Sequence, residues 1–215
     1  WYEDNIFPDD AIHHALMAQD WERAMKLISV LADRLVKRGE IITVFNWLKT
    51  IPDAVLRAHP HLYLQYCHAL VQTGQEKSAD SALDFLEKAA QQDSSFAGEL
   101  ISEQAELARR RGEIQRSIEL ATKAVSLSSS GNLVFRARAS HTLGLNLYEI
   151  GQYDKAWIAF SDAFDMAREA GDYLNASNAQ GYRAFVLFYR GELRKSAELS
   201  QQGIEMAGQS PAAEL

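Results

Sequence analysis

The strongest structural signal in the chain is the stretch SHTLGLNLYEIGQYDKAWIAFSDA, residues 140–163. Its apolar residues recur at intervals of three, four and seven, which is the spacing of one face of an α-helix. They fall on either side of Gly151, so the stretch predicts two helices joined by a turn. The first group is Leu143, Gly144 and Leu147, and the second is Tyr153, Ala156, Phe160 and Ala163. Gly144 and Ala156 are small enough to let the two backbones approach, and Phe160 fills the space beside them.

The same positions resemble the signature of the tetratricopeptide repeat, a helix–turn–helix unit of about 34 residues. The matching residues are Leu143, Gly144, Leu147, Ala156, Phe160 and Ala163. Ser140 departs from the pattern, because the family usually has Trp at that position. One hairpin cannot bury both of its faces, so the resemblance is informative only if the unit recurs along the chain.

Recurrence is indicated by five glycines, each placed to end a helix in the left-handed conformation. They are Gly39, Gly74, Gly112, Gly151 and Gly191, and each interval is slightly longer than the one before it. Four of them open similar phrases, namely GQEKSA, GEIQRS, GQYDKA and GELRKS. The sequence therefore predicts an all-α fold, a tetratricopeptide-like superhelical array of antiparallel helix pairs with about eleven helices.

We expect residues 1–215 to form a single helical-repeat domain. Its predicted parts are the first helices at 1–73, the repeats at 74–208 and a frayed tail at 209–215. Polar breaks at 93–95 and 128–131 are too short for flexible tethers and are expected to separate repeats. Helix starts are expected at Pro8, after a capping Asp20, at Leu62 and near Asn175, with only a short helical turn between Pro52 and Pro60.

Composition places few limits on function. Hydrophobic residues make up 47 % of the chain and charged residues 24 %, which is ordinary for a soluble globular protein. The 22 basic and 29 acidic residues give a formal charge of −7, which disfavours a nucleic-acid surface. The lone Cys67 cannot form an intramolecular disulfide, which fits a cytoplasmic protein, and we expect it to be a small packing residue. No stretch is long and apolar enough to span a membrane.

The segment 1–73 carries a more specific resemblance. The phrases are Trp1-Tyr2-Glu3, the run from Pro8 to Leu16, the run from Asp20 to Ala24, Trp47-Leu48, Ile51-Pro52 and Pro60. Together they resemble the start of the helical-repeat region of MalT-like regulators of the LuxR class. In that family an ATPase module and a winged-helix segment precede this region, and a LuxR-type helix-turn-helix follows it. Since the chain opens on Trp1 without an initiator Met, we expect it to be an excised fragment.

The chemistry of an enzyme is not evident. No phosphate-binding loop, paired cysteines, His-Glu-x-x-His motif or nucleophile elbow occurs. We therefore expect no enzyme and no cofactor in this fragment, and the resemblance implies that ATP binds the parent's absent ATPase domain. His13, His14, His59, His61, His68 and His141 are predicted to be helix-surface residues, with no metal site. His13 and His14 are further expected to pack or hydrogen-bond between helices.

The inner groove of the array is the candidate binding surface. In tetratricopeptide folds the first helix of each hairpin lines this concave side. Carried over by position, the resemblance implies four sets: His61, Leu64, His68 and Val71; Glu99, Ser102, Glu106 and Arg109; Arg138, His141, Leu145 and Tyr148; Asn178, Gly181, Phe185 and Phe188. The predicted effector or partner site is Arg138, His141, Leu145, Tyr148, Asn178, Phe185 and Phe188. Its mixture of aromatic and polar groups suits a peptide, a protein loop or a sugar-like ligand. Packing of Phe185 and Phe188 between helices is the alternative.

The favoured interpretation is an effector-sensing and protein-interaction domain of a MalT-like regulator. It would bind a small-molecule inducer or a regulatory protein and reach DNA only through the parent's C-terminal domain. A free-standing tetratricopeptide adaptor is the alternative, although Glu99 and Glu106 disfavour a clamp for acidic peptide tails. The sequence supports a helical enzyme domain less than either of these interpretations. Apolar residues of the last helix, Leu199, Ile204 and Met206, also predict possible self-association.

Overall fold

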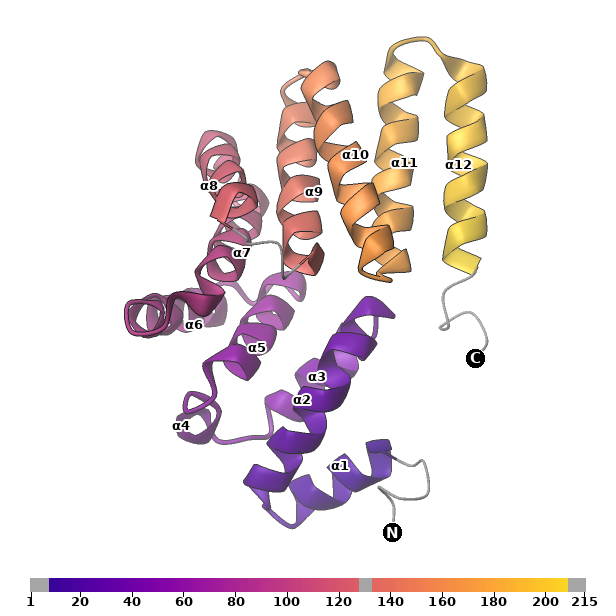
Figure 1. Ribbon diagram of the computed structural model, residues 1–215. Coiled ribbons are helices and arrows are strands. Elements are labelled where there is room, and N and C mark those ends of the chain that lie inside the picture. The colour runs from indigo at the N-terminus through magenta and orange to yellow at the C-terminus, as the bar shows by residue number, and fades with distance from the viewer. Residues whose placement is uncertain (1–7, 128–132, 209–215) are drawn as a thin grey trace. The chain divides into compact units, whose positions relative to one another are not determined.

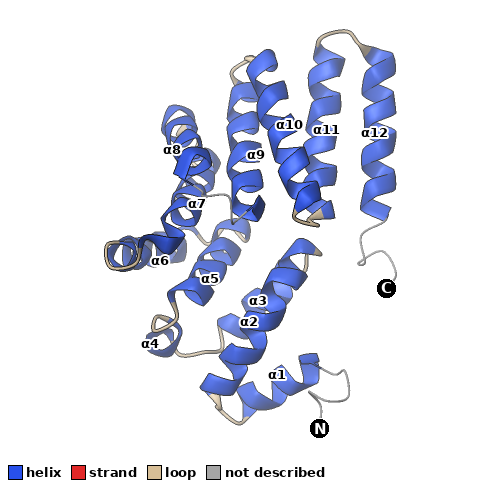
Figure 2. Ribbon diagram, viewed as in Figure 1, coloured by secondary structure: helices blue, strands red, loops and turns tan. Residues whose placement is uncertain are grey.

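The computed structural model describes residues 8–127 and 133–208. These residues form twelve α-helices and one short 3-10 helix, and every regular element among them is helical (Figure 2). They divide into two compact units, residues 1–92 and 93–215. The boundary falls at the polar break 93–95. Whether the two units act as one continuous array stays a prediction.

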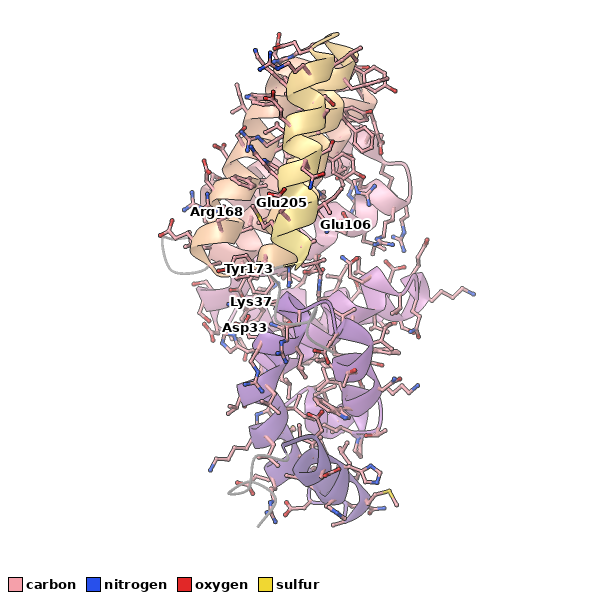
Figure 3. The ribbon with its side chains drawn as sticks, turned by 90° about the vertical axis from the view of Figure 1, so that its right-hand side faces the viewer. Asp33, Lys37, Glu106, Arg168, Tyr173 and Glu205 are labelled. Atoms are coloured by element: carbon pink, nitrogen blue, oxygen red, sulfur yellow. The ribbon has the colours of Figure 1, made fainter. Side chains whose placement is uncertain are left out.

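The first unit contains six helices (Figure 1). They are α1 (Pro8–Met17), α2 (Trp21–Lys37), α3 (Ile41–Leu48), α4 (Asp53–Leu56), α5 (Pro60–Gln72) and α6 (Glu76–Ala90). Their core is built from side chains spaced three and four apart, such as Ile28, Leu31 and Leu35 on α2. The opposite face of α2 is charged, and its Asp33 and Lys37 form an ion pair of 2.8 Å one turn apart (Figure 3). The predicted amphipathic spacing therefore separates core from solvent.

The second unit is a succession of antiparallel hairpins. Its elements are the 3-10 helix η1 (Ser94–Phe96), α7 (Ala97–Arg110), α8 (Ile114–Leu127), α9 (Leu133–Glu149), α10 (Tyr153–Glu169), α11 (Tyr173–Tyr189) and α12 (Leu193–Gly208). Helices α9 to α12 run side by side with alternating direction (Figure 1). The core between them is dominated by alanines and a few large rings, among them Phe160, which is fully buried. Small residues allow the helices to pack closely over their whole length.

The turns inside the hairpins confirm the glycine pattern. All five repeat glycines have positive φ angles, between 72° and 83°. At Gly151 the chain reverses with a backbone N–H of Gln152 donating to the carbonyl of Leu147 at 2.8 Å. The equivalent bond runs from Glu192 to Leu187 at 2.9 Å. A side chain at such a glycine would be strained, because residues with a Cβ rarely adopt this conformation. A sixth glycine of the same kind, Gly171, joins α10 to α11.

Several helix starts follow from local chemistry. Helix α1 begins at Pro8 as predicted, and the Asp20 carboxylate accepts a hydrogen bond from the backbone N–H of Arg23 at the start of α2. The other two predicted starts are each placed slightly too late. Helix α5 begins at Pro60, because proline fits the first turn of a helix. Helix α11 begins at Tyr173, because Asp172 caps it through the backbone N–H of Asn175.

The all-α, tetratricopeptide-like fold is confirmed, and the expected number of about eleven helices falls one short of those described. The additional one is α4, four residues long, which the sequence indicated only as a helical turn. Cys67 is fully buried, as expected of a packing residue. The segments 1–7, 128–132 and 209–215 lie outside the described residues. The phrase Trp1-Tyr2-Glu3, the break 128–131 and the tail are therefore not placed.

Candidate functional site

Most of the first predicted groove set belongs to the core of the first unit. Leu64 and Val71 are 1 % exposed and His68 is 6 % exposed, so only His61 faces solvent. The sequence rule failed here because Leu64, His68 and Val71 lie among the buried residues of α5, which packs against α3 and α6. These three residues are not available to a ligand.

The histidines divide in a way that the sequence did not predict. His13 and His14 are exposed on α1, with their rings 6.0 Å apart in edge-to-face orientation. The expectation that they pack between helices is therefore wrong, and hydrogen bonding between helices stays a prediction. The expectation of a helix-surface residue is wrong for His68, which is buried, and for His141, which is partly enclosed by rings. Among the described residues no group of three or more histidine, cysteine or acidic side chains is placed to hold a metal ion.

A cluster of charges lies at the C-terminal half of α7. The Glu106 carboxylate accepts hydrogen bonds from Arg109 at 2.8 and 2.9 Å and from Arg110 at 2.9 Å. It also accepts one from the Thr142 hydroxyl of α9 at 3.2 Å. Burial by itself would raise the Glu106 pKa, but the two arginines outweigh it and lower that pKa. Glu106, labelled in Figure 3, is therefore a paired anion that joins α7 to α9.

On α9, two predicted site residues carry unpaired polar atoms. The buried Nη1 of Arg138 and the buried Nε2 of His141 have no hydrogen-bond partner among the described residues. The Arg138 guanidinium lies over the Phe135 ring at 5.1 Å from its centroid. Unpaired buried polar atoms cost free energy, so these atoms are candidates for contact with a bound polar group.

His141 is held between aromatic rings. Its ring meets Phe160 at 5.6 Å and Tyr182 at 5.3 Å between centroids, both edge to face. Burial lowers the pKa of His141 to about 4, with the charge of Arg109 adding to the shift and that of Glu106 opposing it. His141 is therefore neutral at pH 7 and acts there as a hydrogen-bonding group without charge.

Four tyrosines form the aromatic edge of the hairpins. The Tyr148 ring lies edge to face with Tyr153 at 5.7 Å and with Tyr189 at 5.6 Å. Tyr153 and Tyr189 are stacked at 5.4 Å, and Tyr182 stacks on Phe160 at 5.1 Å. Burial raises the pKa of the Tyr148 hydroxyl to about 12, and the adjacent Tyr189 adds to the shift. The Tyr148 hydroxyl is therefore neutral at physiological pH, and the rings and hydroxyls of the group suit apolar and hydrogen-bonded contacts.

A pocket of about 670 Å³ opens beside this edge. Its walls come from α9, α11 and α12, and we call it the α11–α12 groove. The lining residues are Tyr148, Ser177, Gly181, Ala184, Phe185, Phe188, Tyr189, Ser196, Ser200, Gly203, Ile204 and Ala207. The surface is mainly apolar, with three serines spaced along it. Its volume lies within the range of ligand pockets in proteins.

The groove brings together three of the predicted site residues and leaves out four. Tyr148, Phe185 and Phe188 line it, and the two phenylalanines are 54 % and 55 % exposed. The alternative in which they pack between helices is therefore wrong. The other four do not line it: Leu145 packs against the core around Phe160, Asn178 is exposed on α11, and Arg138 and His141 lie on α9. The functional role of all seven residues stays a prediction.

Sequence reasoning predicted an exposed apolar surface at Ile204 of α12 but missed the other wall residues of that helix. Ser196, Ser200, Gly203 and Ile204 line the groove, and no tetratricopeptide rule for concave positions includes them. A signal was present, because Ser200 and Gly203 follow Gly191 at the same intervals at which Phe160 and Ala163 follow Gly151. Comparing a hairpin with its predecessor would have shown that Ser200 on α12 replaces the large ring of Phe160 on α10.

No helix among the described residues is long and apolar enough to cross a membrane.

Comparison with known proteins gives weak sequence similarity and a clear fold. No family model matches the sequence. The chain is 23 % identical over 207 residues to the HTH-type transcriptional regulator MalT of Vibrio parahaemolyticus, and 23 % identical to that of Vibrio campbellii. Each match covers 93 % of this chain. The chain spans only 23 % of the length of these curated relatives, so their activity as whole proteins does not transfer to it directly.

Solved structures confirm the architecture. BtubC (BKLC) of P. vanneervenii superposes with a TM-score of 0.58 at 15 % identity, over 93 % of this chain and 87 % of that one. A putative kinesin light chain of Podosopora anserina with nearly identical TPR-like repeats gives 0.51 at 16 %, over 87 % and 96 %. MamA of Desulfovibrio magneticus RS-1 gives 0.51 at 17 %, over 86 % and 96 %. The chain is therefore a tetratricopeptide-like helical-repeat segment with similarity to part of MalT.

Proposed function

We propose that this chain is the effector-sensing and protein-interaction domain of a MalT-like, LuxR-class transcriptional regulator. The observation that carries the proposal is the α11–α12 groove, an open apolar pocket edged by Tyr148, Phe185 and Phe188. The similarity to MalT over 93 % of the chain supports the regulatory context. A groove of this composition binds its ligand through apolar contact, and its serines and tyrosines fix orientation.

The mechanism follows from linkage. An inducer or inhibitory protein that occupies the groove shifts the equilibrium between two arrangements of the helices. The size of that shift is set by the difference between its binding free energies for the two arrangements. That shift would be relayed to ATPase and DNA-binding domains elsewhere in the parent protein. ATP would bind the ATPase domain, so this segment needs no cofactor and acts by binding rather than catalysis. The net charge of −7 supports an indirect route to DNA, in a cytoplasmic regulator.

A free-standing tetratricopeptide adaptor is the second candidate. It is favoured by the open apolar face on the last hairpin, and the tetratricopeptide-like fold shared with solved structures is compatible with it. Both candidates use the same groove. They differ in whether occupancy changes the state of covalently linked domains.

The test is a thermal-shift screen of the full chain against sugars, amino acids and other small metabolites. A ligand that binds only the folded state raises the apparent melting temperature in proportion to the logarithm of its concentration over its dissociation constant. We expect a saturable hit that Phe188→Ala weakens. Ile158→Ala is the matched control, because Ile158 is 60 % exposed on α10 and does not line the groove. A hit that both variants retain would place sensing outside the groove, and no hit would remove small-molecule sensing from the proposal.

A further inference from the structure

The hairpins of the second unit repeat one backbone arrangement. Helices α7, α9 and α11 each end two residues before a turn glycine, and α8, α10 and α12 each begin two residues after it. Those glycines are Gly112, Gly151 and Gly191, and their φ angles lie between 75° and 78°. Counting from the turn glycine therefore identifies equivalent residues in the three hairpins, and their surroundings can be compared position by position.

The first helix of one hairpin docks in the groove of the hairpin before it. Helix α11 docks on α9 and α10, where Ala176 and Ala179 are fully buried in one cluster with residues of both helices. Helix α9 docks in the same way on α7 and α8. The second unit therefore contains two docking interfaces of one kind, and all the helices that form them belong to the chain.

The first of these interfaces contains a buried polar pair. The Ser117 hydroxyl of α8 donates to the carbonyl of Ala105 at 2.7 Å, and an amide N–H of Asn146 on α9 donates to the Ser117 oxygen at 2.7 Å. Both side chains are fully buried. Ser117 lies five residues after Gly112, and Asn146 lies five residues before Gly151. We call the residues at these two positions the docking pair of an interface.

The second interface has an apolar docking pair. Its members are Ala156 of α10, five residues after Gly151, and Val186 of α11, five residues before Gly191. Both are fully buried in one cluster with Phe160. The two interfaces therefore match in backbone arrangement and differ in the polarity of the docking pair.

The polar pair carries a cost that the apolar pair avoids. The Oδ1 atom of Asn146 is buried and has no hydrogen-bond partner among the described residues. Replacing both members of a buried polar pair by apolar groups can be nearly neutral or even stabilising, whereas removing one member leaves the other unpaired. Ala156 and Val186 show that an apolar pair fits this interface. The polar pair is therefore better suited to distinguishing partners than to adding stability.

Docking in the wrong order is a characteristic way for repeat proteins to misassemble. In this unit the error would place α11 in the α7–α8 groove and leave the α9–α10 hairpin undocked. Val186 would then face Ser117, and the bond from Asn146 to Ser117 would be lost. One such hydrogen bond favours the correct order by about fivefold. If the two docking pairs were identical, this preference would vanish.

We propose that the docking pairs specify the order in which the hairpins pack. Asn146 and Ser117 assign α9 to the α7–α8 groove, and Val186 and Ala156 assign α11 to the α9–α10 groove. A single buried polar residue sets the register of a coiled coil in a similar way. The inference goes beyond the proposed function, since it concerns interfaces inside the chain and does not depend on what the α11–α12 groove binds.

Three variants of the full chain test this role. Ser117→Ala with Asn146→Val makes both docking pairs apolar, and Ala156→Ser with Val186→Asn makes both polar. Each double variant copies a pair that the chain already contains, so both should fold, and each should increase the misdocked fraction about fivefold. The fourfold variant combines all four changes, so each helix again matches only its own groove. Misdocking of its α11 would leave a buried amide unpaired, so its misdocked fraction should not exceed that of the unchanged chain.

The misdocked fraction is measured by hydrogen exchange during refolding. Each chain is diluted out of urea, labelled with a short pulse of D2O and digested for mass spectrometry, and size-exclusion chromatography confirms that it is monomeric. Undocked helices exchange their amide hydrogens faster than docked ones. Fragments of α9 and α10 should therefore show a second, faster-exchanging population in the two double variants, while fragments of α7 and α8 stay protected.

The fourfold variant separates specification of order from stability. If the docking pairs only filled the core, four changes should disturb the interfaces at least as much as two, and the fourfold variant should show the largest second population. A fourfold variant that misdocks as much as the double variants would overturn the proposal. Double variants that refold with the same single population as the unchanged chain would overturn it as well.

Discussion

The contact between Gly144 and Phe160 makes a quantitative prediction for the Gly144→Ala variant. A Cβ atom at Gly144 would lie 2.6 Å from two carbons of the Phe160 ring and 3.0 Å from a third. Carbon atoms in good contact are separated by about 3.5–4.0 Å, so the ring would have to retreat by about 1 Å. Phe160 is fully buried, stacked on Tyr182 and flanked by His141, so it has no adjacent space.

Two effects of opposite sign decide how much Gly144→Ala changes the unfolding free energy. Alanine is favoured over glycine inside a helix by about 1 kcal/mol, which would stabilise the variant. Overpacking of a well-filled core costs about 1–3 kcal/mol. Because the Phe160 ring is fixed on two sides, we expect the packing cost to win and Gly144→Ala to lose about 1–2 kcal/mol of unfolding free energy. For a chain of this size the melting temperature should fall by about 2–8 °C.

Gly181→Ala is the matched control. It is the same chemical change in the interior of α11, at a glycine whose added Cβ would meet nothing within 4 Å. Only the helix preference acts there, so this variant should gain about 0.5–1 kcal/mol. Both variants are measured by urea unfolding followed by circular dichroism. A Gly144→Ala variant as stable as the Gly181→Ala variant would refute the reasoning, because it would show that the Phe160 ring yields without cost.

The remaining predictions concern buried polar groups. His141 should lower the unfolding free energy by about 1–3 kcal/mol as the pH falls from about 6.5 to 4, because in this range the unfolded chain takes up a proton at His141 and the folded chain does not. Urea unfolding at each pH should show that the unfolding free energy of His141→Leu depends less steeply on pH than that of the unchanged chain. An equally steep dependence on pH would contradict the assignment. Ser117→Ala alone should cost about 1–3 kcal/mol, because it leaves the buried amide N–H of Asn146 unpaired. Asn146→Val alone should cost about 1 kcal/mol, because it removes the same bond while the Ser117 hydroxyl still donates to the carbonyl of Ala105. The double variant reproduces the Ala156–Val186 pair of the next hairpin, so its cost should be smaller than the sum by at least about 1 kcal/mol, and strict additivity in a double-mutant cycle would exclude the coupling.

Local features of the structure were predictable from the sequence. The five repeat glycines, the cap at Asp20 and the start of α1 at Pro8 depend on backbone conformation and on neighbours a few residues away. The small residue at Gly144 and the ring at Phe160 likewise indicated a close helix crossing. These signals identify the repeat, its hairpins and the all-α class, because each acts within one turn or one hairpin.

Exposure was decided by the tertiary structure. Leu64 and Phe185 occupy concave positions in the repeat pattern, yet Leu64 is 1 % exposed and Phe185 is 54 % exposed. Phe164 and Ile204 occupy equivalent positions in matching hairpins and differ in the same way, because α11 covers the first. The sequence by itself determined which residues form a hairpin, but not which of them face a groove. Whether a groove is filled depends on which helix packs against it, and that is a contact between separate hairpins, which periodicity does not encode.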